Sequence, residues 1–366
     1  MRINVFGTRG FPLIQGGVEK HCECLYPLLS DKCDITVFRR KPYVNQKNRN
    51  ADNLGIHFVD LPSTKIKGIE AALHSFFATI YSLFQKPDIV HIHNIGPAFF
   101  SPILKLRKIK VVLTYHSANY EHDKWGWFAK KLLKWSERIA MNTADTIIFV
   151  NKFQQQKYSD EIQKKSFYIP NGINSAVISQ QDDFITSLGL EKQKYILSVG
   201  RITLEKGFDV LIKAFLKAEL YDYKLVIAGG VEGEEVYFKT LSGLDTKGQV
   251  VFPGFIQGNK LSQLYSHAAL FVLSSYNEGF PIVLLEAMSY HLPILASDIE
   301  ANKMVEMDIS NYFPVGNVSA LTNQIKETLL KPYSSQDYSL EEFDWQSIAD
   351  QTFNVYASKN SKDHSL

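Results

Sequence analysis

The chain has 366 residues, of which 45% are hydrophobic and 21% charged, and its formal net charge is +2. This length exceeds one ordinary hydrophobic core, so the composition predicts a globular protein of two domains. The near-neutral charge gives no electrostatic basis for binding nucleic acid. The three cysteines, Cys22, Cys24 and Cys33, are too few for a disulfide framework and favour a reducing compartment. The Cys22-x-Cys24 spacing is not that of a zinc site, and no metal is predicted there.

Short apolar runs alternate with amphipathic stretches through the first half of the chain. Strands are expected at 3–6, 35–38, 57–59, 89–93, 111–115, 146–150 and 167–169, and helices at 18–29, 71–84 and 127–142. Such alternation predicts a mostly parallel sheet covered on both faces, with ligands bound beyond the carboxyl ends of its strands. No signal peptide is expected, because the first residues already read as a strand.

The longest apolar stretch, residues 71–84, is too short and too polar to span a bilayer. One interpretation is a surface helix of the first domain. The other uses Lys65 and Lys67, which precede the stretch and make it a basic, aromatic-rich face for anionic lipid. We therefore expect a cytoplasmic protein, with peripheral contact at the cytoplasmic face of the inner membrane as the second interpretation.

Two glycine-rich segments follow the first expected strand. Residues 7–12 form the first, and Gly16 and Gly17 come directly before a helix. Glycines at a helix start can cradle a phosphate, although they equally serve simple chain reversal. The spacing matches neither a dinucleotide fingerprint nor a Walker loop.

Three histidines lie at or near strand ends in the first half. His91 and His93 share one face of a strand, and His116 directly follows another. A histidine pair at this spacing can bind metal, but structural or substrate-contact roles are favoured because no third ligand is near in sequence. His116 is either a catalytic or binding group or a packed histidine.

A domain boundary is expected near residue 173. A linker and lead-in helix at 174–191 precede the strands expected at 195–199, 224–228, 250–252, 268–273 and 292–296. We predict an N-terminal domain at 1–173, a second domain at 174–340, and a closing segment at 341–366 whose helix spans 345–357.

Two cations follow the first strand of the second domain. Arg201 and Lys206 precede a helix expected at 208–216. Cations at a strand end can neutralise a diphosphate, with arginine bidentate and lysine a point charge. The alternative is a solvated loop.

The most informative stretch is residues 274–288. An apolar strand leads into a turn that contains Glu278, and Pro281 stands where a helix begins. Glu286 lies among apolar residues, where an unpaired carboxylate is costly. The amides near Gly279 lie at a helix N-terminus, which suits an anion. The two carboxylates can therefore hold the ends of an extended ligand with phosphates between them.

These segments, in this order, resemble the retaining, nucleotide-sugar-dependent glycosyltransferases of family 4. The most specific part is Asn277–Pro281 with Glu286, which leaves seven residues between the two glutamates. Residues 198–201 with 205–207, residues 168–172 and residues 16–19 support it. The opening Gly7–Pro12 looks like the branch that contains bacterial rhamnosyltransferases and polysaccharide-assembly enzymes.

The resemblance implies an α/β fold of the GT-B type. In this architecture two Rossmann-like, doubly wound domains face each other across a cleft, and the last helix returns to the first domain. It implies catalytic roles for Glu278 and His116. It implies donor contacts for Gly16, Gly17, Arg201, Lys206, Gly279, Phe280, Pro281, Ile282 and Glu286.

The implied reaction moves a hexose-type sugar from a nucleoside-diphosphate sugar to a saccharide acceptor. We expect a lipid-linked acceptor in bacterial surface polysaccharide synthesis. The chain has no Asp-x-Asp motif, so no metal or other cofactor is expected. Retention by a covalent intermediate and by a front-face route both stay open, with the front-face route favoured. The alternatives are a nucleotide-sugar epimerase or phosphorylase on this fold, and a non-catalytic nucleotide-sugar-binding protein. Donor sugar and base stay open.

Overall fold

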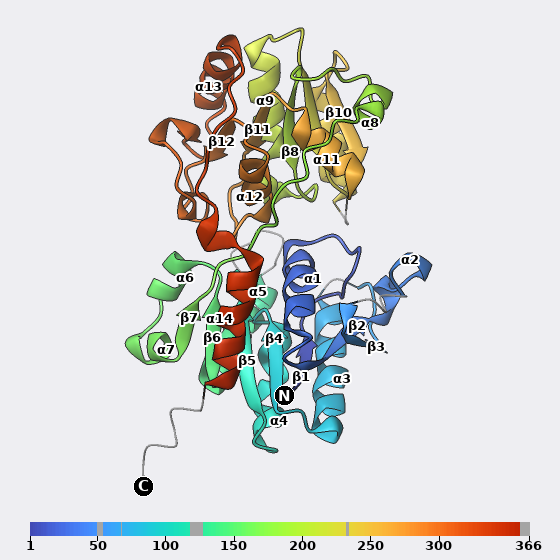
Figure 1. Ribbon diagram of the computed structural model, residues 1–366, viewed down its shortest axis with the longest axis vertical. Helices are drawn as coiled ribbons and strands as arrows, with labels where there is room; N and C mark the ends of the chain where they lie inside the picture. The colour runs from blue at the N-terminus through green and yellow to red at the C-terminus, as the bar shows by residue number, and fades with distance from the viewer. Residues whose placement is uncertain (50–53, 67, 118–126, 232–233, 359–366) are drawn as a thin grey trace. The chain divides into compact units, whose positions relative to one another are not determined.

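The computed structural model describes residues 1–49, 54–66, 68–117, 127–231 and 234–358 (Figure 1). The chain divides into two compact units. Unit 1 comprises Met1–Gly172 together with Phe343–Leu366, and unit 2 comprises Ile173–Glu342. Each unit has its own parallel sheet and its own core.

The sheet of unit 1 has seven parallel strands in the order β3-β2-β1-β4-β5-β6-β7. They are β1 (Arg2–Phe6), β2 (Asp34–Arg40), β3 (His57–Leu61), β4 (Ile89–His93), β5 (Lys110–Tyr115), β6 (Thr146–Phe149) and β7 (Ser166–Tyr168). Every residue of β4 is buried, as expected for a central strand with both faces covered. The strand order reverses between β1 and β4, and a doubly wound sheet binds its ligand at such a point.

Helices cover both faces of this sheet. They are α1 (Gly17–Leu29), α2 (Gln46–Arg49), α3 (Ile69–Gln85), α4 (Ser101–Lys105), α5 (Trp127–Thr143), α6 (Lys152–Gln156), α7 (Asp160–Lys164) and α14 (Trp345–Ala357), with 3₁₀ turns η1 (Lys41–Tyr43) and η3 (Pro97–Phe100). The helices α1 and α14 share one core, while Ala78 of α3 and Ala140 of α5 belong to another.

The helix α14 is fastened to unit 1 at its C-terminal end. Lys110 Nζ donates to the carbonyl oxygens of Val355, Tyr356 and Ser358 at 3.0, 3.1 and 2.7 Å. A lysine there satisfies carbonyls that lack helical partners and complements the negative end of the helix dipole. The last described helix is thereby part of unit 1.

The sheet of unit 2 has six parallel strands in the order β10-β9-β8-β11-β12-β13. They are β8 (Tyr195–Val199), β9 (Lys224–Ala228), β10 (Val250–Gly254), β11 (Leu270–Leu273), β12 (Ile294–Ser297) and β13 (Tyr312–Phe313). The surrounding helices are α8 (Asp183–Ser187), α9 (Phe208–Ala218), α10 (Glu235–Leu244), α11 (Asn259–Ser266), α12 (Ile282–Ser289) and α13 (Val318–Leu330), and the 3₁₀ turns are η5 (Leu204–Lys206), η6 (Asn302–Met304) and η7 (Ile309–Asn311). A further turn, η8 (Glu341–Phe343), leads back to unit 1.

Two parallel sheets covered by helices confirm the predicted α/β class. The sequence did not predict the strand β13 or the helices α2, α4, α6, α7, α10 and α11. Among the described residues, no helix combines the length and apolarity needed to cross a bilayer.

Candidate active site

The segment between β11 and α12 is held against the turn η5. Tyr276 N donates to Glu205 O at 2.8 Å, and Ser274 Oγ donates to Lys206 O at 2.9 Å. On the other side, Ser297 Oγ donates to Ser275 O at 2.6 Å. The loop that carries Glu278 is therefore fixed by backbone and hydroxyl groups on both sides.

Gly207 makes this close approach possible. Its φ is +61°, and a Cβ atom at this position would lie 2.3 Å from Ser274 O. A side chain therefore meets both a strained backbone and a backbone atom that does not move freely. The glycine in the Glu205-Lys206-Gly207 segment is required by the packing of η5 against the Glu278 loop.

Lys206 and Glu278 form an ion pair inside unit 2. Lys206 Nζ lies 2.5 Å from Glu278 Oε1, and the two side chains are only 15% and 10% exposed. Ser275 Oγ donates to the same carboxylate oxygen at 2.6 Å. The sequence predicted that Lys206 and Glu278 act on different parts of one ligand, and the structure places their charged groups in contact. Pairing offsets the cost of holding each charge away from water.

The helix α12 begins directly after this pair. Pro281 is its N-cap residue and Ile282 its first residue, and Phe280 and Ile282 are buried. The amides at the start of α12 lack helical acceptors, and the helix dipole adds positive potential there. The N-terminus of α12 and the nearby ammonium group of Lys206 both favour the binding of an anion.

Glu286 is oriented from a different direction. Tyr265 OH, from α11, donates to Glu286 Oε2 at 2.8 Å, and the Tyr265 ring stacks on Tyr290 at 5.0 Å between centroids. Burial, followed by the charge of Glu286, raises the pKa of Tyr265 well above its usual value, so Tyr265 stays a donor. The half-buried carboxylate in the middle of α12 thus has a fixed orientation.

The segment that carries Arg201 is set by a close approach of two glycines. A Cβ atom on Gly229 would lie 1.7 Å from Gly200 O. Ile202 N donates to Gly230 O at 3.0 Å, which fixes the backbone on the other side of Arg201. Arg201 therefore leaves β8 at a defined point, as the sequence predicted.

The glycine loop of unit 1 is tied to α1 through Glu19. Glu19 Oε1 accepts from Arg9 N at 3.1 Å, and a Cβ atom on Gly16 would lie 2.0 Å from Glu19 Oε2. Gly16 has a φ of +149°, which a side chain rarely adopts. Within the described residues, no atom lies within 4 Å of a Cβ built on Gly17. Gly16 is thus needed by the fold, whereas Gly17 leaves the start of α1 open.

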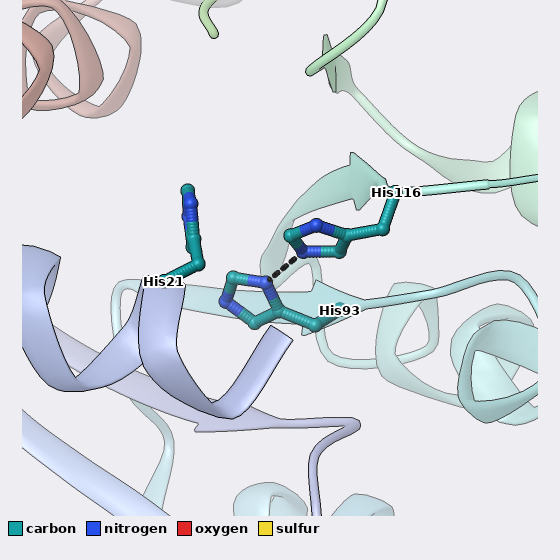
Figure 2. Close-up of side chains that lie close together, drawn as sticks. All are labelled: His21, His93 and His116. Atoms are coloured by element: carbon teal, nitrogen blue, oxygen red, sulfur yellow. Dashed lines mark hydrogen bonds between the residues drawn. The ribbon is translucent and has the colours of Figure 1, made fainter. Parts of the chain in front are cut away.

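His116 belongs to a cluster of buried histidines (Figure 2). His93 Nδ1 and His116 Nε2 lie 2.9 Å apart, and His21 Nδ1 lies 2.8 Å from Asn171 Oδ1. His21 comes from α1, His93 from the end of β4, and His116 directly follows β5. Burial lowers the pKa of His21 to about 4 and the pKa values of His93 and His116 well below 6.5. All three imidazoles are therefore neutral at pH 7.

The cluster also offers one possible set of metal ligands. Ring nitrogens of His21, His93 and His116 all lie within 4.8 Å of one another, and neutral imidazole is a common ligand of zinc. Tetrahedral zinc at its usual bond length of about 2.1 Å requires ligand nitrogens roughly 3.4 Å apart. His93 and His116 are closer than that and already share a hydrogen bond. The arrangement as it stands fits shared protons better than a bound ion.

The sequence interpretation missed His21 as part of this cluster. Its position in the sequence could have indicated it. His21 lies one helical turn after Gly17, so it shares a helix face with the start of α1. The stacking of His91 on His93, at 4.5 Å between ring centroids, follows from their shared strand face as predicted. Only tertiary contacts join the helix to the strand ends.

Comparison with known proteins identifies the chain. The model of glycosyltransferase family 4 matches residues 15–177, and that of glycosyl transferases group 1 matches residues 180–341. The chain is a family 4 glycosyltransferase.

Among relatives of this glycosyltransferase is the alpha-galactosylglucosyldiacylglycerol synthase of Streptococcus pneumoniae. The two are 30% identical over 236 residues, which is 60% of this chain and 62% of the relative. The sucrose-phosphate synthase of Thermosynechococcus elongatus has a TM-score of 0.79 at 19% identity, covering 97% of this chain and 98% of that one. The Anabaena protein HepE in complex with UDP-glucose also has a TM-score of 0.79, at 16% identity, covering 98% and 99%. These structures establish the GT-B fold with its two Rossmann-like units.

Proposed function

We propose that this glycosyltransferase moves a hexose-type sugar, with retention of anomeric configuration, from a nucleoside-diphosphate sugar to a saccharide acceptor. The observation that carries the proposal is the Lys206–Glu278 pair beside the start of α12, with Glu286 further along that helix. Together they provide a cation, the N-terminal amides of a helix and two carboxylates along one short path. Helix N-termini and cations bind phosphate, and carboxylates accept hydrogen bonds from sugar hydroxyls, so these groups suit a nucleoside-diphosphate sugar. HepE, which shares the fold, has been solved with UDP-glucose.

The proposed roles follow from the chemistry of each group. Arg201, Lys206 and the amides from Gly279 to Ile282 bind the departing diphosphate, with Gly16 and Gly17 as further donor contacts. Glu286 accepts from the ribose hydroxyls, and Tyr265 holds it in that orientation. Glu278 and His116 act at the transferred sugar.

The contacts of Glu278 favour a front-face route over a covalent intermediate. Glu278 Oε1 is already engaged by Lys206 and by Ser275. A carboxylate that accepts two hydrogen bonds, one from a cation, is a poor nucleophile but a well-placed negative charge beside an oxocarbenium-like sugar. In the front-face route the leaving phosphate itself takes the proton of the acceptor.

We further propose that the reaction needs no metal ion. The charge on the departing diphosphate is met by Arg201, Lys206 and the start of α12. Treatment with EDTA is therefore expected to leave the rate unchanged. Complete loss of activity, restored by Mg²⁺ or Mn²⁺, would contradict this assignment.

The acceptor is proposed to be a lipid-linked saccharide in bacterial surface polysaccharide synthesis, at the cytoplasmic face of the membrane. The argument starts from α3, whose buried face is polar or small and whose exposed face is apolar. The buried residues include His74, Ser75, Thr79 and Ser82, and the exposed large hydrophobic residues are Ile69, Leu73, Phe76, Phe77, Tyr81 and Phe84. An apolar stripe on the solvent side of a helix marks an interaction face.

This apolar face extends beyond α3. The Phe76 ring contacts Phe100 at 5.6 Å, and Phe99 contacts the exposed Trp135 of α5 at 5.2 Å between centroids. The basic flank of the face includes Lys65, whereas Lys67 lies outside the described residues. The Streptococcus relative, by its name, is a diacylglycerol glycolipid synthase, which supports a lipid acceptor. The likeness of Gly7–Pro12 to rhamnosyltransferases supports polysaccharide assembly.

A panel of nucleotide sugars tests the proposed activity. The true donor, at a hundred times its dissociation constant, should raise the free energy of unfolding by about 2.7 kcal/mol. With acceptor present, NMR of the product should show the anomeric configuration of the donor. Isomerisation or phosphorolysis of the donor without acceptor would instead support the epimerase or phosphorylase alternative. Binding without any turnover would support the binding protein.

A further inference from the structure

A chain of buried hydrogen bonds leads from α14 to His116. Tyr356 OH lies 2.6 Å from His91 Nδ1, and Tyr26 OH lies 3.0 Å from the same nitrogen and 2.5 Å from His93 Nε2. The chain ends with His93 Nδ1 and His116 Nε2, 2.9 Å apart. All five side chains are buried. In such a chain the direction of each bond is fixed by which atoms can donate.

Of the two histidine nitrogens near Tyr26 OH, His93 Nε2 is the closer one. A hydroxyl carries a single proton, and His93 Nε2 is nearer to it than His91 Nδ1. His91 Nδ1 lies nearer to Tyr356 OH, at 2.6 Å, than to Tyr26 OH, at 3.0 Å, so Tyr356 is its closer hydrogen-bond partner. If His91 instead carries its proton on Nδ1, that nitrogen accepts nothing, and the 2.5 Å contact with His93 Nε2 still favours His93 as the acceptor for Tyr26.

A second donor also faces His93 Nε2. Cys22 Sγ lies 3.5 Å from this nitrogen. Burial raises the pKa of the Cys22 thiol well above its usual value, and burial does the same for Tyr26, so both groups keep their protons. Two protonated groups therefore face Nε2. This arrangement favours Nε2 as the acceptor, which leaves the proton of the neutral His93 ring on Nδ1.

We propose that Tyr26 and His93 are positioning residues that hold His116 in the tautomer protonated on Nδ1. His93 Nδ1–H donates to His116 Nε2, which is thereby an acceptor, and the single proton of the neutral His116 ring lies on Nδ1. Figure 2 shows this second nitrogen on the side of the ring away from His93. His116 then offers an N–H donor to an oxygen of the donor sugar and does not act as a base. The assignment of His116 to the sugar rests on the proposed function, whereas its tautomer does not.

The tautomer is directly measurable. Protein with ¹⁵N-labelled histidine should show His116 with a protonated Nδ1 and a bare Nε2, identified by the loss of its signals in His116→Gln. His116 protonated on Nε2 would overturn the proposal. This measurement needs neither donor nor acceptor, so it is independent of whether the protein proves to be a glycosyltransferase.

Tyr26→Phe tests the positioning role with minimal change in shape. Loss of this hydroxyl should release His93, shift part of His116 to the other tautomer, and lower kcat about three- to tenfold. The KM for the nucleotide sugar should change less than twofold. The matched control is Tyr195→Phe, because Tyr195 is also buried and its hydroxyl donates to Leu264 O in unit 2. A tautomer of His116 unmoved by Tyr26→Phe would contradict the role.

A metal ion at the cluster is the rival outcome. If one Zn²⁺ binds the wild-type protein with submicromolar affinity and His93→Ala abolishes that binding, the proposal fails, because a coordinated Nδ1 cannot donate to His116. We expect weak zinc binding that is unaffected by His93→Ala.

Discussion

Lys206 and Glu278 are proposed to bind opposite charges of one substrate, yet in this structure each is the partner of the other. A donor whose phosphate bound Lys206 would have to exchange one partner of the lysine for another. The ion pair therefore holds both side chains in place, and their charges compensate each other until the substrate binds. Removing one partner leaves a poorly hydrated charge behind, which costs more than removing both.

This reciprocity gives a double-mutant prediction. Lys206→Met and Glu278→Gln should each lower stability, and the double variant should lose less than their sum by about 0.5–3 kcal/mol. In turnover assays Glu278→Gln should lose about 10²- to 10³-fold in kcat. Lys206→Met should weaken donor binding by a contact worth roughly 1.5–3 kcal/mol.

The control for this cycle is Lys213→Met, because Lys213 forms an exposed ion pair with Asp209 in α9. We expect it to change stability and rate little. Strict additivity between Lys206 and Glu278 would show that the observed pair is energetically irrelevant.

Gly207 supports a prediction about the backbone. Gly207→Ala should lower the free energy of unfolding by about 1–3 kcal/mol, because a methyl group there meets Ser274 O and a positive φ. Gly243→Ala in α10 is the matched control, since nothing lies within 4 Å of its added Cβ among the described residues. Alanine at 243 should be neutral or stabilise by up to about 1 kcal/mol. Equal effects in chemical denaturation would contradict the packing argument.

At the residue scale, the sequence indicated candidate residues but not the side chains that contact them. Glu286 was a candidate because it lies among apolar residues, and Glu278 and Lys206 were candidates because they follow expected strands. The Lys206–Glu278 contact and the role of His21 depend on chain segments that meet only after folding. A local sequence pattern does not show contacts between segments that are far apart in the chain.

Among the elements, α3 departs most from the usual burial of a surface helix. Its position was predicted closely, but its orientation was not. The helical periodicity of the apolar residues defines one apolar face but does not say whether that face packs on the sheet. Asn4 Nδ2 donates to Ser82 Oγ at 3.1 Å, so the sheet itself presents polar groups to this helix. The strand β4 was predicted to the residue, since it is a continuous buried run. The strand β13 has only two residues, which is too short to show the alternation of apolar and polar residues that predicts a strand.

The orientation of α3 predicts binding to anionic vesicles. Replacement of Phe76 and Phe84, which are 41% and 82% exposed, by serine should reduce flotation with such vesicles at least tenfold. The control is Phe167→Ser, which removes a similarly exposed ring from β7. Activity on a soluble acceptor analogue should persist in both. Unchanged flotation would remove α3 as the lipid-binding face.

For the whole molecule, burial of neutral histidines predicts acid sensitivity. Unfolded histidines take up protons below a pKa of about 6.5, whereas burial lowers the pKa of His21 to about 4 and those of His74 and His91 to about 3. Between these values the unfolded state binds more protons, so the free energy of unfolding falls as the pH drops from about 6.5 toward 4.

The slope of this decrease identifies its source. Each such histidine contributes up to about 1.4 kcal/mol per pH unit, so His74→Gln should make the curve shallower by that amount. Chemical denaturation at several pH values measures it. An unchanged slope would mean that His74 is protonated equally in both states.

The discontinuity of unit 1 has a consequence for synthesis. Its chain leaves at Gly172 and returns at Phe343, and the Trp345 ring packs so close to Gly172 that a Cβ there would lie 2.5 Å from it. During translation, unit 1 must wait for all of unit 2 before Trp345 and Tyr356 can cover α1 and the buried histidines. A nascent chain that has not yet reached Trp345 lacks these two side chains, so the buried hydrogen-bond chain to His116 is still incomplete at that stage.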